Sequence, residues 1–340
     1  MTWTDVRSSG MTALRRLRSA RGGTVVVLTY HRIAEADRDP LGITVTPAHF
    51  AEHVAAFADR YELLTVGDLT RLLAEGRPLP RRGLCITLDD GYIDALTTAL
   101  PILARHDAVA TVFACSGFID ERREFWWDEL EDAILSSPRL PERIEFAVGD
   151  ACFARELPFT TSAPGSDVRR QLFTDLRDLI EPLSSADRED VLYALRGRIP
   201  REPFARDDRR PLTGEELRGL AASGLVEIGA HTVNHVRLGA LPLDEQREEI
   251  EGSKRRLEEI LDRRVGTFSY PHGTPGSFTI DTERLVREVG FAGAVTTSLG
   301  RGLPWGSVSR RSDRFALPRT ATADVSAAEL VALIDKRLGL

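Results

Sequence analysis

The chain has 340 residues, 42% hydrophobic and 29% charged, which is typical of a globular protein with one large α/β domain or two smaller ones. Its formal net charge of −7 argues against a general nucleic-acid binder, because affinity for phosphate backbones comes from clustered Lys and Arg. No stretch approaches the ~20 apolar residues of a transmembrane helix, and an odd number of cysteines without Cys-x-x-Cys spacing favours reduced thiols and a cytoplasmic location.

Residues 1–22 are rich in arginine, and we expect them to form a basic N-terminal tail. The apolar run that follows, 25–30, is shorter than the ~7 to 15 residues of a signal-peptide core, so a secretory signal is not expected. Contact of the tail with anionic lipid at a membrane surface is the alternative.

Short apolar runs then alternate with segments of helical spacing. The first run ends in His31, and a later one, 84–88, ends in Asp89 and Asp90. Strand and helix in alternation predict a parallel sheet, whose carboxyl edge is where α/β proteins place their sites. His49 and His53 lie on a predicted helix, 47–60, and are expected to be surface or packing residues because no strand end presents them.

Two adjacent carboxylates at one strand end need an explanation. One Asp commonly caps the next helix, here predicted over 93–105. A second carboxylate this close raises the pKa of the first unless a cation or a proton intervenes. The Asp89-Asp90 pair therefore suggests a metal site with ligands elsewhere.

The second half of the chain supplies such ligands. After a predicted strand, 225–229, His231 and His235 stand four residues apart, on one face if this segment turns helically. Two His and one carboxylate form a common open ligand set for a catalytic divalent metal. Further strands are predicted over 265–270 and 291–297, so the strands that end on one edge favour a closed (β/α) barrel.

The middle of the chain departs from this regularity. We expect an insertion over about 121–211 with mainly helical patterns, lying over the rim of the barrel. Trp126 and Trp127 open it, and either they pack in a core or Trp127 stacks on a sugar ring.

Three segments resemble the motifs of the polysaccharide deacetylases, carbohydrate esterase family four. The sequence 87–91 is similar to their Thr-Phe-Asp-Asp-Gly motif, 231–235 to His-Ser/Thr-x-x-His, and 268–273 to Arg-x-Pro-Tyr-Gly. The resemblance covers Thr24 to about Arg319 and implies a distorted seven-stranded barrel in a single domain, 23–340. The Tyr-His at the end of the first strand resembles the start of circularly permuted members.

The resemblance also implies roles. Asp90, His231 and His235 would bind the metal, with Zn²⁺ preferred over Co²⁺, Ni²⁺ or Mn²⁺. Asp89 would be the general base that activates a metal-bound water. His31, protonated in the resting enzyme, would be the general acid that protonates the leaving amine.

The third motif departs from the family pattern, with Ser269 in place of Arg and His272 in place of Tyr. Arg319 is a candidate for the missing cation; the alternative is a surface arginine. The residues expected to contact the substrate or the oxyanion are Tyr270, Pro271, His272, Gly273, Trp127 and Arg319.

These residues predict a metal-dependent hydrolase that removes N-acetyl groups from a sugar or glycan. Two alternatives stay open: a catalytically inactive glycan-binding barrel, and a hydrolase of a non-sugar amide on the same fold.

Overall fold

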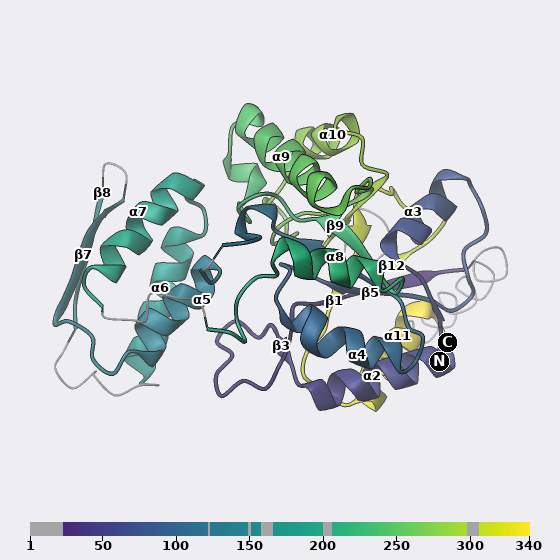
Figure 1. Cartoon of the computed structure of the whole chain (residues 1–340), viewed down its shortest axis with the longest axis horizontal. Helices are drawn as coiled ribbons and strands as arrows, with labels where there is room; N and C mark the ends of the chain where they lie inside the picture. Colours follow the sequence, from purple (N-terminus) through teal and green to yellow (C-terminus); the bar gives the residue numbers. More distant parts are fainter. Residues whose placement is uncertain (1–22, 122, 149–150, 158–165, 200–205, 298–305) are drawn as a thin grey trace, which may run out of the picture.

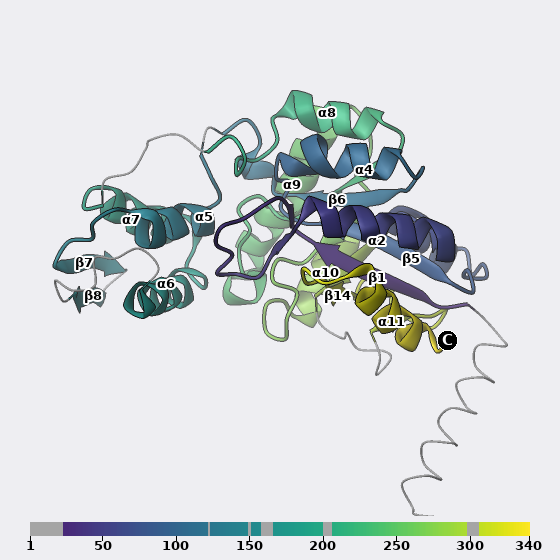
Figure 2. The same cartoon turned by 90° about the horizontal axis from the view of Figure 1, so that it is seen from below.

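The computed structural model describes residues 23–121, 123–148, 151–157, 166–199, 206–297 and 306–340, so the predicted basic tail, 1–22, lies outside the described residues. Figure 1 shows a sheet surrounded by helices and a second lobe that projects to one side. Figure 2, turned by 90°, shows the same two parts. Within the described ranges, no helix is both long and apolar enough to cross a membrane.

The main sheet is a barrel of parallel strands. Its order is β1 (Val25–Tyr30), β5 (Gly83–Leu88), β6 (Ala110–Ala114), β9 (Val226–Ala230), β10 (Thr267–Ser269) and β11 (Gly293–Thr296). The last strand is bent: β13 (Leu317–Pro318) pairs with β11, and β14 (Thr320–Ala321) pairs with β1. The sheet therefore returns to its first strand, and the predicted (β/α) barrel is confirmed. Two short strands, β4 (Glu62–Leu63) and β12 (Ser307–Val308), pair with the starts of β5 and β1.

The strands have apolar side chains on both faces because both faces are covered. In β1, Val25 and Val27 belong to one hydrophobic cluster, which also contains Phe113, whereas Val26 and Leu28 belong to a second and larger cluster. This alternation is the period of two expected of a strand. Every residue of β1 and β5 is buried.

Helices connect and cover the strands. They are α2 (Pro47–Arg60), α3 (Val66–Ala74), α4 (Leu100–Ala104), α8 (Gly214–Ala222), α9 (Leu243–Leu261), α10 (Ile280–Glu288) and α11 (Ala327–Leu338). A capping box begins α8, with Thr213 as its N-cap and Glu216 as the reciprocal partner. The single helix expected over 93–105 is instead a π-helix, Ala95–Ala99, followed by α4. Pro101 explains the change, because proline has no N–H for the regular i to i−4 hydrogen bond.

The insertion forms the second lobe. It contains α5 (Trp126–Glu131), a π-helix (Asp132–Ser136), the hairpin β7 (Arg143–Val148) and β8 (Ala151–Glu156), α6 (Asp167–Ile180) and α7 (Ser185–Arg196). Its own hydrophobic cluster also includes Tyr92, Cys115 and Phe118, which follow β5 and β6. The insertion is therefore packed against the carboxyl ends of the barrel strands. Its hairpin was not expected from sequence, although Ile144, Phe146 and Val148 alternate as a strand requires.

Candidate active site

The two aspartates sit on a sharp turn at the end of β5. Asp90 has φ 72° and Gly91 has φ 88°, so two successive residues adopt the left-handed conformation. The Asp89 amide donates to the Tyr30 carbonyl at 2.9 Å, which ties this turn to the end of β1. Both carboxylates are 3% exposed. The sequence therefore places two acids in a buried site at the carboxyl edge of the sheet.

The segment 231–235 is a loop, not the helical turn expected from the His spacing. Thr232 has φ 64° and His235 has φ 51°, and these left-handed residues fold the loop back on itself. The Thr232 hydroxyl accepts a hydrogen bond from the His235 amide at 3.0 Å. The expected outcome, two imidazoles on one side, is reached by a different backbone path.

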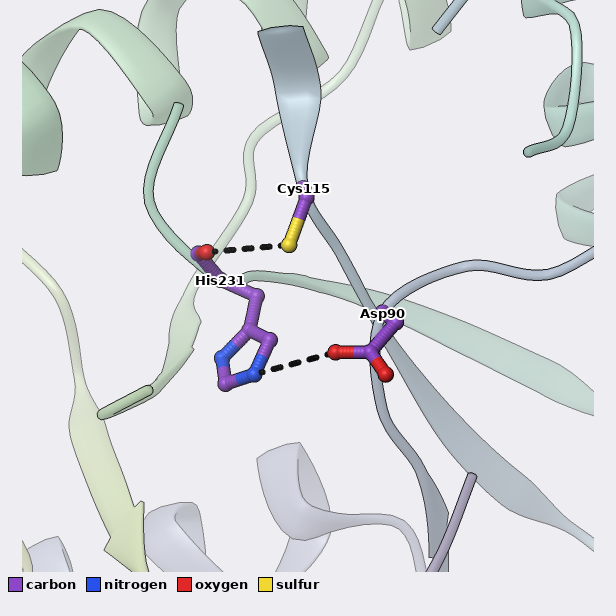
Figure 3. Close-up of side chains that lie close together, drawn as sticks. All are labelled: Asp90, Cys115 and His231. Atoms are coloured by element: carbon purple, nitrogen blue, oxygen red, sulfur yellow. Dashed lines mark hydrogen bonds and ion pairs between the residues drawn. The ribbon is translucent and has the colours of Figure 1, made fainter. Parts of the chain in front are cut away.

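Both imidazoles face Asp90. Nε2 of His231 lies 3.6 Å and Nε2 of His235 lies 3.5 Å from Oδ1 of Asp90. Nδ1 of His231 is 2.8 Å from the Ser269 carbonyl oxygen, which can only accept, so Nδ1 carries the proton and Nε2 keeps its lone pair. Figure 3 shows the Asp90 carboxylate and the His231 ring pointing toward each other.

Burial sets the protonation of this group. Desolvation raises the pKa of Asp90 well above its ordinary value, and the neighbouring charge of Asp89 adds to the effect. Desolvation lowers the pKa of His231 to about 4 and that of His235 well below 6.5, so both rings are neutral at pH 7. A bound cation would accept the Nε2 lone pairs of His231 and His235 and would supply the positive charge that the Asp90 carboxyl needs in order to ionise.

The donors fit a divalent metal. Oδ1 of Asp90 is buried and has no hydrogen-bond partner, although the two imidazole nitrogens surround it. Asp90, Cys115 and His231 also form a group whose potential ligand atoms lie within 4.8 Å of one another. The Cys115 thiol, however, donates to the His231 carbonyl at 3.4 Å, and burial raises its pKa well above 9. A protonated, hydrogen-bonded thiol is a poorer ligand than the His235 nitrogen.

Arg319, the candidate for the missing cation, lies between β13 and β14 and is fully buried. Its Nη1 and Nη2 donate to the two carboxylate oxygens of Asp89 at 2.7 and 2.6 Å. Nη2 also donates to Oγ of Ser269 at 2.9 Å. The guanidinium thus stands beside the serine that replaces the family's arginine, and the alternative of a surface arginine does not hold. Burial alone would raise the pKa of Asp89, but the Arg319 charge, His231 and these hydrogen bonds outweigh it and lower that pKa to about 2.

His31 follows β1 next to the Asp89 turn, because Tyr30 and Leu88 are paired in the sheet. Its pKa is lowered from 6.5, first by burial and also by the Arg319 charge, against the opposing effect of Asp89. The neutral ring therefore dominates at pH 7. This corrects the expectation that His31 is protonated in the resting protein.

Of the third motif, 268–273, the turn 271–273 lies at the site and the side chain of Tyr270 does not. His272 has φ 60°, and its ring lies 4.8 Å from that of His235, with Nε2 buried and unpartnered. Gly273 has φ 56°, and a Cβ there would lie 2.2 Å from the Thr297 nitrogen, so glycine is required; Pro271 is buried beside it. Tyr270, in contrast, donates from its hydroxyl to the Phe315 carbonyl at 3.0 Å and stacks on Phe278, so its side chain belongs to the core and not to the site.

Trp127 packs instead of presenting a sugar platform. It is 5% exposed, and its ring stacks on Phe125 and meets the His235 ring at a centroid distance of 4.7 Å. Its Nε1 donates to the Tyr92 hydroxyl at 2.7 Å. The packing alternative is the one that the structure supports.

Two residues that the sequence did not single out hold the 231–235 loop. The carboxylate of Glu249, on α9, accepts hydrogen bonds from the backbone amides of Val233 and Asn234 at 2.9 Å each. Arg188, on α7, donates to the carbonyls of Asn234 and His235 at 3.1 and 3.5 Å. Neither has a local sequence signal, since each acts on a loop reached only through the fold.

Comparisons with known proteins concern the sequence and the fold. Residues 183–294 match the family model for polysaccharide deacetylase. The Bacillus subtilis (strain 168) protein YxkH, a provisionally named polysaccharide deacetylase, is 18% identical over 304 residues, 89% of this chain and 73% of its own. The structure of the Streptococcus pyogenes deacetylase PplD in complex with acetate superposes with a TM-score of 0.59 at 18% identity, over 92% of this chain and 99% of its own. IcaB from Ammonifex degensii gives a TM-score of 0.58 at 18% identity, over 92% and 97%. Residues 183–294 thus match the polysaccharide deacetylase family model, and the chain shares the barrel fold of these deacetylase structures.

Proposed function

We propose that this protein is a metal-dependent hydrolase that removes N-acetyl groups from an acetylated sugar or glycan. The observation that carries the proposal is the pairing of Asp89 with Arg319 beside a second group, Asp90, His231 and His235, whose donors fit a metal. A glycan-binding barrel would need neither a buried base with its own cation nor three converging ligands. The acetate in the PplD structure is consistent with a site that handles an acetyl group.

Asp90, His231 and His235 would hold the metal, and neutral imidazoles with a carboxylate favour Zn²⁺, with Co²⁺, Ni²⁺ or Mn²⁺ as alternatives. When bound, the cation supplies Lewis acidity toward the acetyl carbonyl and the attacking water. That acidity matters because Asp89, with a pKa of about 2, is reliably ionised but intrinsically a weak base.

The residues of the chain divide the proton transfers. Asp89 takes a proton from the water whose oxygen attacks the carbonyl carbon, and Arg319 holds the carboxylate in place throughout. The protonated form of His31, which is the minor form at pH 7, delivers its proton to the leaving nitrogen as the C–N bond breaks, which gives acetate, a free amine and the neutral imidazole. His272 and the turn at Pro271 and Gly273 lie beside the His235 ring, where we place the acetyl group.

The remaining assignments are proposals of the same kind. We propose a single domain over 23–340 with the 121–211 segment inserted in it, a permuted strand order that starts with the His31 strand, and a cytoplasmic location.

The test is metal content and acetate release, measured on the purified protein over a panel of N-acetylated sugars. Removing a ligand by Asp90→Asn, His231→Ala or His235→Ala should abolish tight metal binding and turnover. Asp89→Asn should retain the metal and lose about 100-fold or more in rate. Asp94→Asn is the matched control, because Asp94 is also a buried carboxylate near this turn but pairs with Arg32.

Equal loss of metal in Asp89→Asn and Asp90→Asn would overturn the division of roles. Stoichiometric metal with no acetate release from any acetylated sugar would overturn the proposed activity.

A further inference from the structure

The two imidazoles at the site are held in different ways. His231 is oriented by its hydrogen bond to the Ser269 carbonyl, a contact from the barrel itself. Nδ1 of His235 is buried and has no hydrogen-bond partner. Histidine ligands usually need such a partner to fix the ring, so something else must orient His235.

Arg188 holds the backbone of His235 from the insertion. Besides the carbonyls of Asn234 and His235, its guanidinium donates to the carbonyls of Glu181 and Leu183, at 3.2 and 3.5 Å. One side chain therefore joins the end of α6 to the 231–235 loop. Glu249 holds the amides of the same loop from the barrel side, so the loop is clamped from both directions.

Burying the charge of Arg188 costs free energy. It is 4% exposed, and within the described residues no carboxylate lies within ion-pair distance of its guanidinium. It also stands in the first turn of α7, where the helix dipole disfavours a cation. Its direct contacts are carbonyl oxygens and the ring of Trp126, 4.8 Å away, and the charges of Glu249 and Glu181 act on it only from beyond ion-pair distance, so burial of this cation is unfavourable for stability alone. The contacts of Arg188 with the 231–235 loop offer a functional reason for burying this cation.

Trp127 holds the ring of His235, also from the insertion. Its indole meets the imidazole at a centroid distance of 4.7 Å and an angle of 60°. The indole is fixed in turn, because Nε1 donates to the Tyr92 hydroxyl and Tyr92 donates to Asp128 at 2.5 Å. Arg188 acts on the main chain of His235 and Trp127 acts on its side chain.

We propose that Arg188 and Trp127 are positioning residues for His235, so that metal affinity depends on how the insertion docks on the barrel. This inference rests on the proposed function, since it takes His235 as a metal ligand. It gives the 121–211 insertion a role in the metal site, in addition to any contact with substrate.

The experiment titrates the full-length protein, freed of metal by chelation, with Zn²⁺ alone in competition with a chromophoric chelator. Loss of a group that orients a ligand typically costs about 10–100-fold in metal affinity, and Arg188→Met should fall in that range. Arg169→Met is the matched control. Arg169 is also a fully buried arginine of the insertion that donates to main-chain carbonyls, of Ile134 and Ser137, but it does not contact the 231–235 loop. The control should destabilise the insertion and leave the Zn²⁺ dissociation constant within about threefold of wild type.

Two further measurements separate positioning from a general loss of structure. Millimolar guanidinium ion should restore part of the Zn²⁺ affinity in Arg188→Ala, because it can occupy the vacated site between the carbonyls. Trp127→Leu should weaken Zn²⁺ binding even if the arginine variants fail to fold. Unchanged Zn²⁺ affinity in both Arg188→Met and Trp127→Leu, or an equal loss in Arg169→Met, would overturn this inference alone. A wild-type protein that binds no Zn²⁺, Co²⁺, Ni²⁺ or Mn²⁺ would overturn the proposed function, and the inference with it.

Discussion

Replacing Arg319 by Met tests the buried ion pair on which the proposed base depends. The arginine side chain is fully buried and donates to both oxygens of Asp89, which is itself 3% exposed. Removing one partner of such a pair leaves a buried charge without compensation and costs about 3–5 kcal/mol. The same side chain also donates to Thr87, Ser269, Thr297 and the carbonyl of Thr296, so those acceptors lose a donor too.

The assay is thermal unfolding of chelator-treated protein at pH 7, so that metal binding contributes nothing to stability. A loss of about 3–5 kcal/mol in a chain of this size corresponds to a decrease in Tm of about 4–7 °C. The double variant Arg319→Met with Asp89→Asn should recover at least about 2 kcal/mol relative to Arg319→Met alone, because no unpaired charge is left buried.

The control is Arg206→Met, which breaks the two-point pair of Arg206 with Glu124 in the insertion. Arg206→Met should lower stability, and its cost should simply add to that of Asp89→Asn in the double variant. If Arg319→Met costs less than about 1 kcal/mol, or if its cost simply adds to that of Asp89→Asn, the reasoning about this pair is wrong.

Three further predictions concern other residues. Burial raises the pKa of Asp128 to about 7, above the ordinary 3.8, so the folded state binds a proton that the unfolded state releases, and stability should fall as the pH rises from about 4 to 7. Urea unfolding curves of Asp128→Asn should show this fall reduced by up to about 4 kcal/mol, and identical pH dependence in wild type and variant would contradict the prediction. Gly273→Ala should cost about 1–3 kcal/mol or more and disrupt the site, because φ is 56° and the added Cβ meets the Thr297 nitrogen, whereas Gly266→Ala, with open space around its Cβ, should be tolerated. In the wild type, kcat/KM should decline with rising pH as His31 loses its proton, with a midpoint below pH 6.5 because the pKa of His31 is lowered. His31→Gln should retain Zn²⁺ and show no such decline, and matching pH profiles in wild type and variant would exclude His31 as the proton donor.

The barrel and the acids at its edge were predictable because the signals are local. A buried strand such as 84–88 is a short apolar run, and Asp89 and Asp90 follow it directly in the sequence. The carboxyl ends of parallel strands meet at one edge, so His231 could be placed near them without knowing any distance.

Other features depended on the backbone or on distant partners. The fold of the 231–235 loop is set by single left-handed residues, Thr232 and His235, which no spacing rule reveals. Tyr270 was expected at the site because it lies inside a motif, but alternation along the strand turns its side chain into the core. Arg188 had no signal at all, since its target loop is 46 residues away in sequence.

The position of Arg319 in the closing strand has a consequence for how the protein is made. Asp89 precedes its cation by 230 residues, and β14, which follows Arg319, pairs with the first strand of the barrel. During synthesis, a nascent chain could form the β1 and β5 pair early, but Asp89 would have no counter-charge until the segment around Arg319 had left the ribosome and closed the sheet. The ionised Asp89 and the closed barrel would then arise in a single late event, so intermediates on the way to the native state would lack the Asp89–Arg319 pair.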